Sequence, residues 1–164
     1  MIFIDDIIAV SNLHRAIESG HLLNVRKVLN QRPLALEIPN KSGQTPLGIA
    51  TVKNDINLVN VLLAYGADVD SIEVGSWRTP LMTASYKGHS ELVEILREKG
   101  SSWEIKDRSG LTALHYAVDN SHLEVVQKAI EEGADIKAKD KFGWSPMMRG
   151  GKFPGFIDGS KPFG

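Results

Sequence analysis

The chain has 164 residues, of which 42% are hydrophobic and 24% charged, fractions that are typical of a folded globular protein. Its 19 Lys and Arg residues and 20 Asp and Glu residues leave a net charge of −1, so overall charge predicts no attraction to nucleic acid or to an anionic membrane. Cysteine is absent, which excludes disulfides, thiolate metal sites and cysteine nucleophiles.

The first ten residues are mostly apolar, but Asp5 and Asp6 interrupt them and no basic residue precedes them. A secretory signal needs the opposite arrangement, and no apolar run approaches the roughly 20 residues that span a bilayer. We therefore expect neither a signal nor a membrane segment. One expectation is that this start adds helical turns that fold over the open edge of the domain, through Ile2, Phe3, Ile4, Ile7 and Ile8.

A three-residue motif recurs along the chain at intervals of 34, 33 and 33 residues, at 45–47, 79–81, 112–114 and 145–147. A second marker begins at Gly66, Gly100 and Gly133, at intervals of 34 and 33. Both intervals of 34 contain the segment between Gly66 and Thr79, so a single inserted residue explains both. Such a period predicts a solenoid, in which modules too small to fold alone stack into one core.

Each repeat is predicted to hold two short helices. The Thr of the Thr-Pro-Leu motif suits the N-cap and the Pro suits the first helical position. The second helix carries an apolar stripe and ends at a glycine, where a left-handed residue is needed. Core positions are predicted at Leu62 and Leu96. In the first repeat the inward side chains are expected to be Leu13, Ala16, Ile17, Val25, Val28 and Leu29.

These motifs resemble the ankyrin repeat. The pattern is carried by residues 110–117 (Gly-Leu-Thr-Ala-Leu-His-Tyr-Ala), 66–70 (Gly-Ala-Asp-Val-Asp) and 88–96. The resemblance implies an all-α ankyrin-repeat solenoid of helix-turn-helix units with β-hairpin loops, which we call fingers. We expect one repeat domain at 1–149, divided into an N-terminal capping repeat at about 6–39, repeats at 40–73, 74–106 and 107–139, and a partial repeat at 140–149.

A Gly/Pro-rich tail occupies 150–164, where glycine and proline preclude the second helix of the last repeat. We therefore expect apolar surface to be exposed at this end. Three remedies remain open: the tail covers it, two chains join end to end, or a partner or a missing part of the natural protein covers it. The tail residues suited to a cover are Phe153, Phe156, Ile157 and Phe163.

The five histidines suggest a metal or catalytic site, but the repeat separates them. His14 and His115 share one position of the repeat, and His21, His89 and His122 share another, so they form ladders spaced about one repeat apart. We expect them to hydrogen-bond nearby backbone. No phosphate-binding loop or nucleophile elbow occurs. We therefore predict no enzyme activity, no catalytic residue, no metal site and no cofactor.

In ankyrin-like stacks the fingers and first helices line a concave groove. Trp, Tyr and Arg are the residue types most enriched at interface hot spots. Trp77 occupies the position usually held by the turn glycine, so its finger is expected to depart from the family geometry. Trp103 is expected to pack locally instead. The predicted partner-binding residues are Trp77, Arg78, Tyr86, Lys87, Lys106, Arg108, Leu111, Asp119, Asn120, Lys139, Phe142 and Trp144.

Charge adds a further expectation for the last two fingers. Their basic residues would steer an acidic partner segment to this side, and salt would weaken it, whereas the second helices carry glutamates. A solvated charged surface is the alternative. The residues concerned are Lys106, Arg108, Lys137, Lys139 and Lys141, with Asp107, Asp135 and Asp140 among them.

The predicted function is a non-enzymatic protein-protein interaction module, an intracellular scaffold or adaptor in the cytoplasm, the nucleus or both. We expect another protein as partner and neither nucleic acid nor membrane. Two alternatives are self-assembly through the uncapped C-terminal repeat and a substrate-recruiting subunit of an enzyme complex. A nearer resemblance, to the ankyrin part of fibronectin type III and ankyrin repeat proteins, would imply a nuclear or cytoplasmic germ-cell regulator. It rests on residues 13–17, 39–41, 100–103, 112–115 and 143–149.

Overall fold

A computed structural model describes residues 4–152 of the chain. Short helices joined by loops make up this part. In order they are α1 (Ile4–Glu18), α2 (Leu22–Gln31), the 3₁₀ helix η1 (Pro33–Glu37), α3 (Pro46–Val52), α4 (Ile56–Ala64), α5 (Pro80–Lys87), α6 (Ser90–Glu98), α7 (Ala113–Asp119), α8 (Leu123–Glu131), α9 (Pro146–Arg149) and the 3₁₀ helix η2 (Gly150–Lys152).

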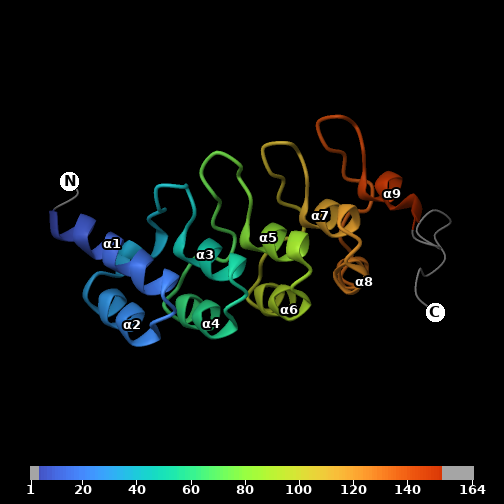
Figure 1. Cartoon of the computed structure of the whole chain (residues 1–164). Coiled ribbons are helices and arrows are strands. Elements are labelled where there is room, and N and C mark those ends of the chain that lie inside the picture. Colours follow the sequence, from blue (N-terminus) through green and yellow to red (C-terminus); the bar gives the residue numbers. More distant parts are fainter. Residues whose placement is uncertain (1–3, 153–164) are drawn as a thin grey trace.

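The helices stand in two parallel rows (Figure 1). The odd-numbered helices α1 to α9 form the first row, and α2, α4, α6 and α8 form the second. Four loops project from the first row, on the side away from the second row. We number these loops fingers 1 to 4, at residues 38–45, 70–79, 104–112 and 137–145. The all-α solenoid is thus confirmed, and no residue between 4 and 152 lies in a β-strand.

The helix starts follow the predicted capping chemistry. The Thr45 hydroxyl accepts a hydrogen bond from the Gly48 N–H at 3.1 Å, at the start of α3. In the same way Thr79 accepts from the Met82 N–H at 3.2 Å, at the start of α5. Both helices have Pro as their first residue, where the missing N–H costs nothing. The Thr-Pro pair therefore determines where α3 and α5 begin.

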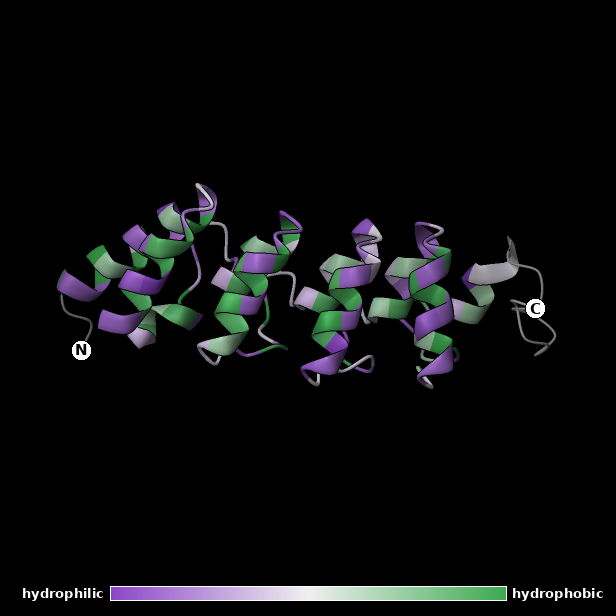
Figure 2. Ribbon diagram, turned by 90° about the horizontal axis from the view of Figure 1, so that it is seen from below, coloured by the Kyte–Doolittle hydropathy of each residue, from purple (hydrophilic) through white to green (hydrophobic). Residues whose placement is uncertain are grey.

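The core lies between the two rows and runs along the whole stack. Leu62 and Leu96 are completely buried, as predicted. Figure 2, seen from the side of the second row, shows hydrophobic and hydrophilic residues on each helix of that row. In the first repeat the expected inward side chains are buried except Val28, which is half-buried. The first-row helices can approach closely because buried alanines face one another there, at Ala16, Ala50, Ala84 and Ala117.

The fingers are tight turns that are joined edge to edge. In finger 1, the Asn40 N–H donates to the Gln44 carbonyl at 2.9 Å, and the Gly43 N–H donates back to the Asn40 carbonyl at 2.9 Å. Single backbone hydrogen bonds then link each finger to the next, which makes the four fingers one ridge. These bonds run from the Val74 N–H to the Gly43 carbonyl (2.8 Å), from Arg108 to Ser76 (3.0 Å) and from Lys141 to Ser109 (3.0 Å).

Finger 2 differs from the others by its inserted residue. Its closing bond runs from the Glu73 N–H to the Arg78 carbonyl, which spans one residue more than the Asn40–Gln44 bond of finger 1. Trp77 nevertheless has a φ of +62°, the left-handed backbone that glycine provides at the corresponding position of the other fingers. The expected departure from the family geometry is therefore a wider turn, and the backbone conformation at Trp77 is retained.

The N-terminal segment is helical as expected, but it does not cover the edge of the domain. Ile4, Ile7 and Ile8 are 76%, 60% and 53% exposed, so that expectation is wrong for these three residues. Arg32 forms ion pairs of 3.7 Å with Asp5 and with Asp6, which hold the polar side of this helical turn against the domain. The isoleucines then face water. Ile2 and Phe3 lie outside the described residues.

At the other end, α9 has four residues and is followed by the short η2. Met148 of α9 is 56% exposed. The tail residues proposed as a cover, Phe153, Phe156, Ile157 and Phe163, lie outside the described residues. Within 4–152, no helix is both long enough and apolar enough to cross a membrane.

Candidate functional site

The predicted binding residues lie on fingers 2 to 4 and at the C-terminal ends of α5 and α7, which we call the finger surface. Leu111 is half-buried against the core, and the other members are exposed. The structure brings Arg78 together with Tyr86. Among residues 4–152, no ring contact joins Trp77, Phe142 and Trp144. These three aromatic rings are 51%, 82% and 54% exposed.

Arg78 is the centre of the most organised part of this surface. Its guanidinium lies 5.0 Å from the ring centre of Tyr116 and 6.0 Å from that of Tyr86. The two tyrosine rings meet edge to face, with their centres 6.0 Å apart. The Arg78 Nε also donates a hydrogen bond to the Tyr116 hydroxyl at 2.9 Å. Arg78 is thus held in place although it is exposed.

Tyr116 and Asp107 complete this cluster, although neither was among the predicted partner-binding residues. The Tyr116 hydroxyl donates to Asp107 Oδ2 at 2.6 Å. Burial, reinforced by the hydrogen bond to Asp107, raises the pKa of Tyr116 to about 12, so this donor keeps its proton. One signal was available, because Tyr116 lies three residues before Asp119 and therefore on the same face of α7.

Two of the predicted contact residues, Asp119 and Asn120, form hydrogen bonds at the C-terminal end of α7. Asp119 accepts a hydrogen bond from Arg149 Nη1 at 2.5 Å, and Asn120 Nδ2 donates to the Tyr116 carbonyl at 2.9 Å. Asp119 and Asn120 therefore support the C-terminal end of α7. The remaining exposed members of the finger surface are basic or aromatic.

Two of the histidines, His115 and His122, make structural contacts between repeats. His115 Nδ1 accepts from the Thr112 N–H at 3.0 Å, and its Nε2 lies 3.2 Å from the Trp144 carbonyl of finger 4. His122 Nε2 lies 2.9 Å from the Tyr86 carbonyl at the end of α5. Burial lowers the pKa of His115. Among the residues that the structure describes, no three His, Asp or Glu side chains are grouped to hold a metal ion.

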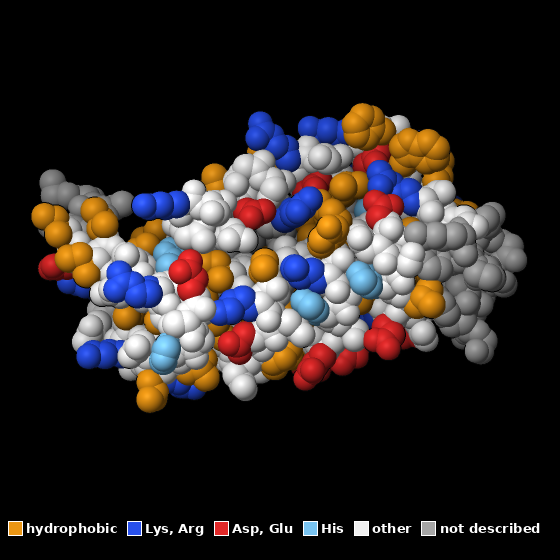
Figure 3. Space-filling model, viewed as in Figure 1, with side chains coloured by type: hydrophobic (Ala, Val, Ile, Leu, Met, Phe, Trp, Pro, Cys, Tyr) orange, Lys and Arg blue, Asp and Glu red, His pale blue; other side chains and the backbone are white. Residues whose placement is uncertain are grey.

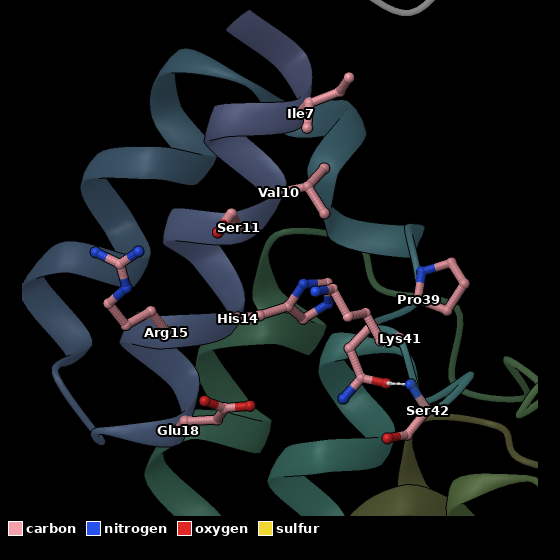
Figure 4. Close-up of a pocket in the computed structure, with 10 residues that line it drawn as sticks. Ile7, Val10, Ser11, His14, Arg15, Glu18, Pro39, Lys41 and Ser42 are labelled. Carbon is pink, nitrogen blue, oxygen red and sulfur yellow. Dashed lines mark hydrogen bonds between the residues drawn. The ribbon is translucent and has the colours of Figure 1, made fainter. Parts of the chain in front are cut away.

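His14 differs from His115, although the two share one position of the repeat. Its side chain is buried, and its Nε2 has no hydrogen-bond partner among the described residues. Burial lowers its pKa. A cavity of about 430 Å³ lies beside it, between α1 and finger 1, with Val10 and Lys41 among its walls (Figure 4).

The second-row side of the same repeats carries acidic residues. An open hollow of about 350 Å³ lies between α6 and α8, with Glu91, Glu94, Glu124 and Glu131 in its walls. Figure 3 shows acidic side chains along this lower edge, and basic and hydrophobic side chains at the tips of the fingers. The protein is therefore polarised across its two faces despite a net charge of −1.

Trp103 packs locally, as expected. It is buried, its Nε1 donates to Glu132 Oε2 at 3.0 Å, and the Arg97 guanidinium lies 5.4 Å from its ring centre. Glu132 also accepts from Arg97 and pairs with Lys128. This cluster ties α6 to α8 and leaves Trp103 unavailable to a partner.

Two family matches cover the middle of the chain. Residues 42–73 match the family described as "Ankyrin repeat", and residues 72–140 match "Ankyrin repeats (3 copies)". Together they extend from finger 1 to finger 4. The partial repeat and the nearer resemblance to fibronectin type III and ankyrin repeat proteins stay predictions.

Among curated proteins, the chain is similar to the mouse "B-cell lymphoma 3 protein homolog", with 32% identity over 69% of this chain and 25% of that protein. It is 32% identical to the rice "Probable E3 ubiquitin-protein ligase XBOS34", over 92% of this chain and 28% of that protein. It is 28% identical to the yeast "Probable 26S proteasome regulatory subunit p28", over 84% of this chain and 62% of that protein. The chain therefore spans less than two thirds of each of these relatives.

Proposed function

Because the chain belongs to the ankyrin repeat family, we propose that it binds another protein through the finger surface and catalyses no reaction. Ankyrin repeats are protein-protein interaction modules, and neither family match indicates a catalytic family. The role is that of a scaffold or adaptor. We place it inside the cell, in the cytoplasm or nucleus.

The observation that carries this proposal is the Arg78–Tyr86 pair. Tyr86 is 47% exposed and Arg78 is exposed as well, yet both side chains are held by contacts with Tyr116. Side chains that are already ordered lose little conformational entropy when a partner binds. Exposed and pre-ordered Tyr and Arg residues are the usual anchors of protein interfaces.

Two other roles have some support. A substrate-recruiting subunit of an enzyme complex is supported by the similarity to a probable ubiquitin ligase and to a probable proteasome subunit. Self-association through the C-terminal end is supported by the exposure of Met148 on α9. Light scattering over a concentration series tests the second role, since a mass that stays constant excludes it.

The main test compares captured proteins between the intact chain and a Tyr86→Ala/Arg78→Ala double variant. A partner that uses the finger surface is lost from the variant. The matched control is Leu23→Ala/Arg26→Ala on α2, which also removes one large apolar and one basic side chain from an exposed surface. A partner that both variants retain within twofold binds elsewhere and contradicts the proposal.

A further inference from the structure

The aspartates of fingers 3 and 4 are turned into the protein, whereas Glu104 at the base of finger 3 is exposed. Asp107 is only 8% exposed, and its Oδ1 accepts hydrogen bonds from the Ser109 and Leu111 N–H groups at 2.8 and 2.9 Å. Its Oδ2 accepts from the Tyr116 hydroxyl. This carboxylate closes the turn of its own finger and presents almost no surface to a ligand.

Asp140 repeats this arrangement one finger further on. It is 7% exposed, and its Oδ1 accepts from the Phe142 and Trp144 N–H groups at 2.8 and 2.9 Å. Arg149 binds its Oδ2. Burial opposes the charge of Asp140, but these donors outweigh burial and lower its pKa, so it stays ionised and internally neutralised.

Unlike Asp107 and Asp140, the basic side chains of the finger surface keep their charge exposed. Lys106 Nζ donates to the Lys139 carbonyl at 2.9 Å, and Arg108 Nη1 donates to the Gly75 carbonyl at 3.3 Å. A carbonyl positions such a group without cancelling its charge. Lys87, Lys106, Arg108 and Lys139 are all exposed, and none of them pairs with a carboxylate among residues 4–152.

Among these basic side chains, Arg78 has the guanidinium whose orientation is best fixed. Its Nε is bonded to Tyr116, and its two terminal nitrogens have no hydrogen-bond partner among the described residues. A guanidinium held by two aromatic rings retains the planar fork that a carboxylate binds with two parallel hydrogen bonds.

Exposed apolar groups lie among these charges. Trp77 precedes Arg78 on finger 2, and Phe142 and Trp144 stand on finger 4. Figure 3 shows hydrophobic and basic side chains side by side at the fingertips. A ligand for this surface must therefore supply both negative charge and apolar side chains.

We propose that the finger surface binds an acidic segment of a partner protein, in which Asp or Glu residues alternate with aromatic or aliphatic ones and one carboxylate occupies the free fork of Arg78. This inference rests on the proposed protein-binding function. Single-stranded nucleic acid also combines negative charge with flat apolar groups. The peptide is favoured because its charges are spaced by apolar side chains, as the cations are here, and because the chain as a whole is not basic.

The experiment selects peptides from a phage-displayed random library on the intact chain and measures the binding of selected peptides by fluorescence anisotropy. We expect enrichment of Asp and Glu beside aromatic or aliphatic residues. Replacing the acids of a selected peptide by Asn and Gln, or Arg78 by Gln, is expected to weaken binding about tenfold, because each removes a charge-assisted pair. Affinity is expected to fall as salt is raised.

The variant Lys87→Gln provides a second reading at a separate cation, with a smaller loss expected. Arg26→Gln on α2 is the matched control and is expected to leave affinity unchanged, and thermal melting checks that each variant is folded. Oligothymidylate serves as the nucleic-acid probe. If it binds the chain more tightly than the selected peptides, and if its affinity falls in Arg78→Gln alone among the variants, the inference is overturned in favour of nucleic acid.

Two further outcomes separate the inference from the function it rests on. Selected peptides that are neutral or basic, yet are weakened by Tyr86→Ala, overturn the acidic partner and keep the finger surface as a binding site. Selected peptides that bind equally well to the Tyr86→Ala and Arg78→Gln variants, or a library from which nothing is enriched, overturn both.

Discussion

The N-terminal part of the protein (residues 4–45) and its middle part (residues 70–104) contain equivalent positions in different surroundings. Gly20 and Gly88 both end a first-row helix with a left-handed backbone, at φ of +72° and +71°. A Cβ at Gly20 would meet no atom within 4 Å, whereas one at Gly88 would lie 2.3 Å from Nδ1 of His122. The backbone is the same, and only the neighbouring repeat differs.

The two parts also differ at the surface. The N-terminal part exposes isolated apolar side chains such as Ile4 and Leu34, and His14 lacks a partner for its Nε2. The middle part has a packed helix pair on each side, and its exposed side chains Arg78 and Tyr86 are held by α7. A repeat thus acquires organised surface chemistry from the repeat that follows it.

The largest expected effect lies in the core. Leu96→Ala in α6 is expected to lower the free energy of unfolding by about 2–5 kcal/mol, because it empties a fully buried site between two neighbouring helices. Leu29→Ala in α2, at the end of the stack, should fall toward the lower limit, since fewer helices surround it. Urea denaturation measures both. The control Leu34→Ala is 83% exposed and should change stability by less than about 0.5 kcal/mol.

The next effect compares the two glycines directly. Gly20→Ala is expected to cost about 1 kcal/mol, the strain of a left-handed alanine. Gly88→Ala is expected to cost about 2–3 kcal/mol, since it must also displace the His122 ring from its hydrogen bond to Tyr86. Equal losses in thermal melts of the two variants would contradict this account of the contact between α5 and α8.

A smaller effect is expected at the turn of finger 2. Trp77→Gly should relieve about 1 kcal/mol of left-handed backbone strain, but the buried half of the Trp77 ring is lost as well, so the net change in stability should be smaller than about 1 kcal/mol. Gly43→Ala in finger 1 is the opposite test. Its Cβ would lie 2.8 Å from the Val74 carbonyl oxygen, so that variant should be destabilised. Differential scanning calorimetry measures both shifts.

The smallest effect is a drift of stability with pH. Burial lowers the pKa of both His14 and His115 from the ordinary 6.5. The unfolded chain then binds more protons than the folded protein, so stability is complete above pH 6.5 and declines as the pH falls below it. His115→Gln should reduce this decline in urea midpoints. An equally steep decline in the His115→Gln variant would contradict this account.

The repeat, the helix starts and the core leucines could all be predicted, since each depends on residues within one module. Thr79 and Pro80 define the start of α5 wherever the module lies. The exposure of the N-terminal turn was predicted wrongly. Ile4, Ile7 and Ile8 are apolar, but the orientation of their turn depends on the ion pairs of Arg32 with Asp5 and Asp6, which the apolar pattern does not reveal. The positions of Arg78 and Tyr86 on the surface followed from the repeat, but their support by Tyr116 did not.

The amino-acid sequence by itself determined the period, the helix starts, their caps and the core leucines, because propensity and capping act over a few residues. Only the tertiary structure decided which of two equivalent residues contacts the adjacent repeat, as Gly88 contacts His122, and which has no such neighbour, as at Gly20. It also decided that Lys106 and Arg108 donate to backbone carbonyls of the neighbouring fingers. Those outcomes depend on atoms contributed by the adjacent module about 30 residues away, and a pattern confined to one module does not contain them.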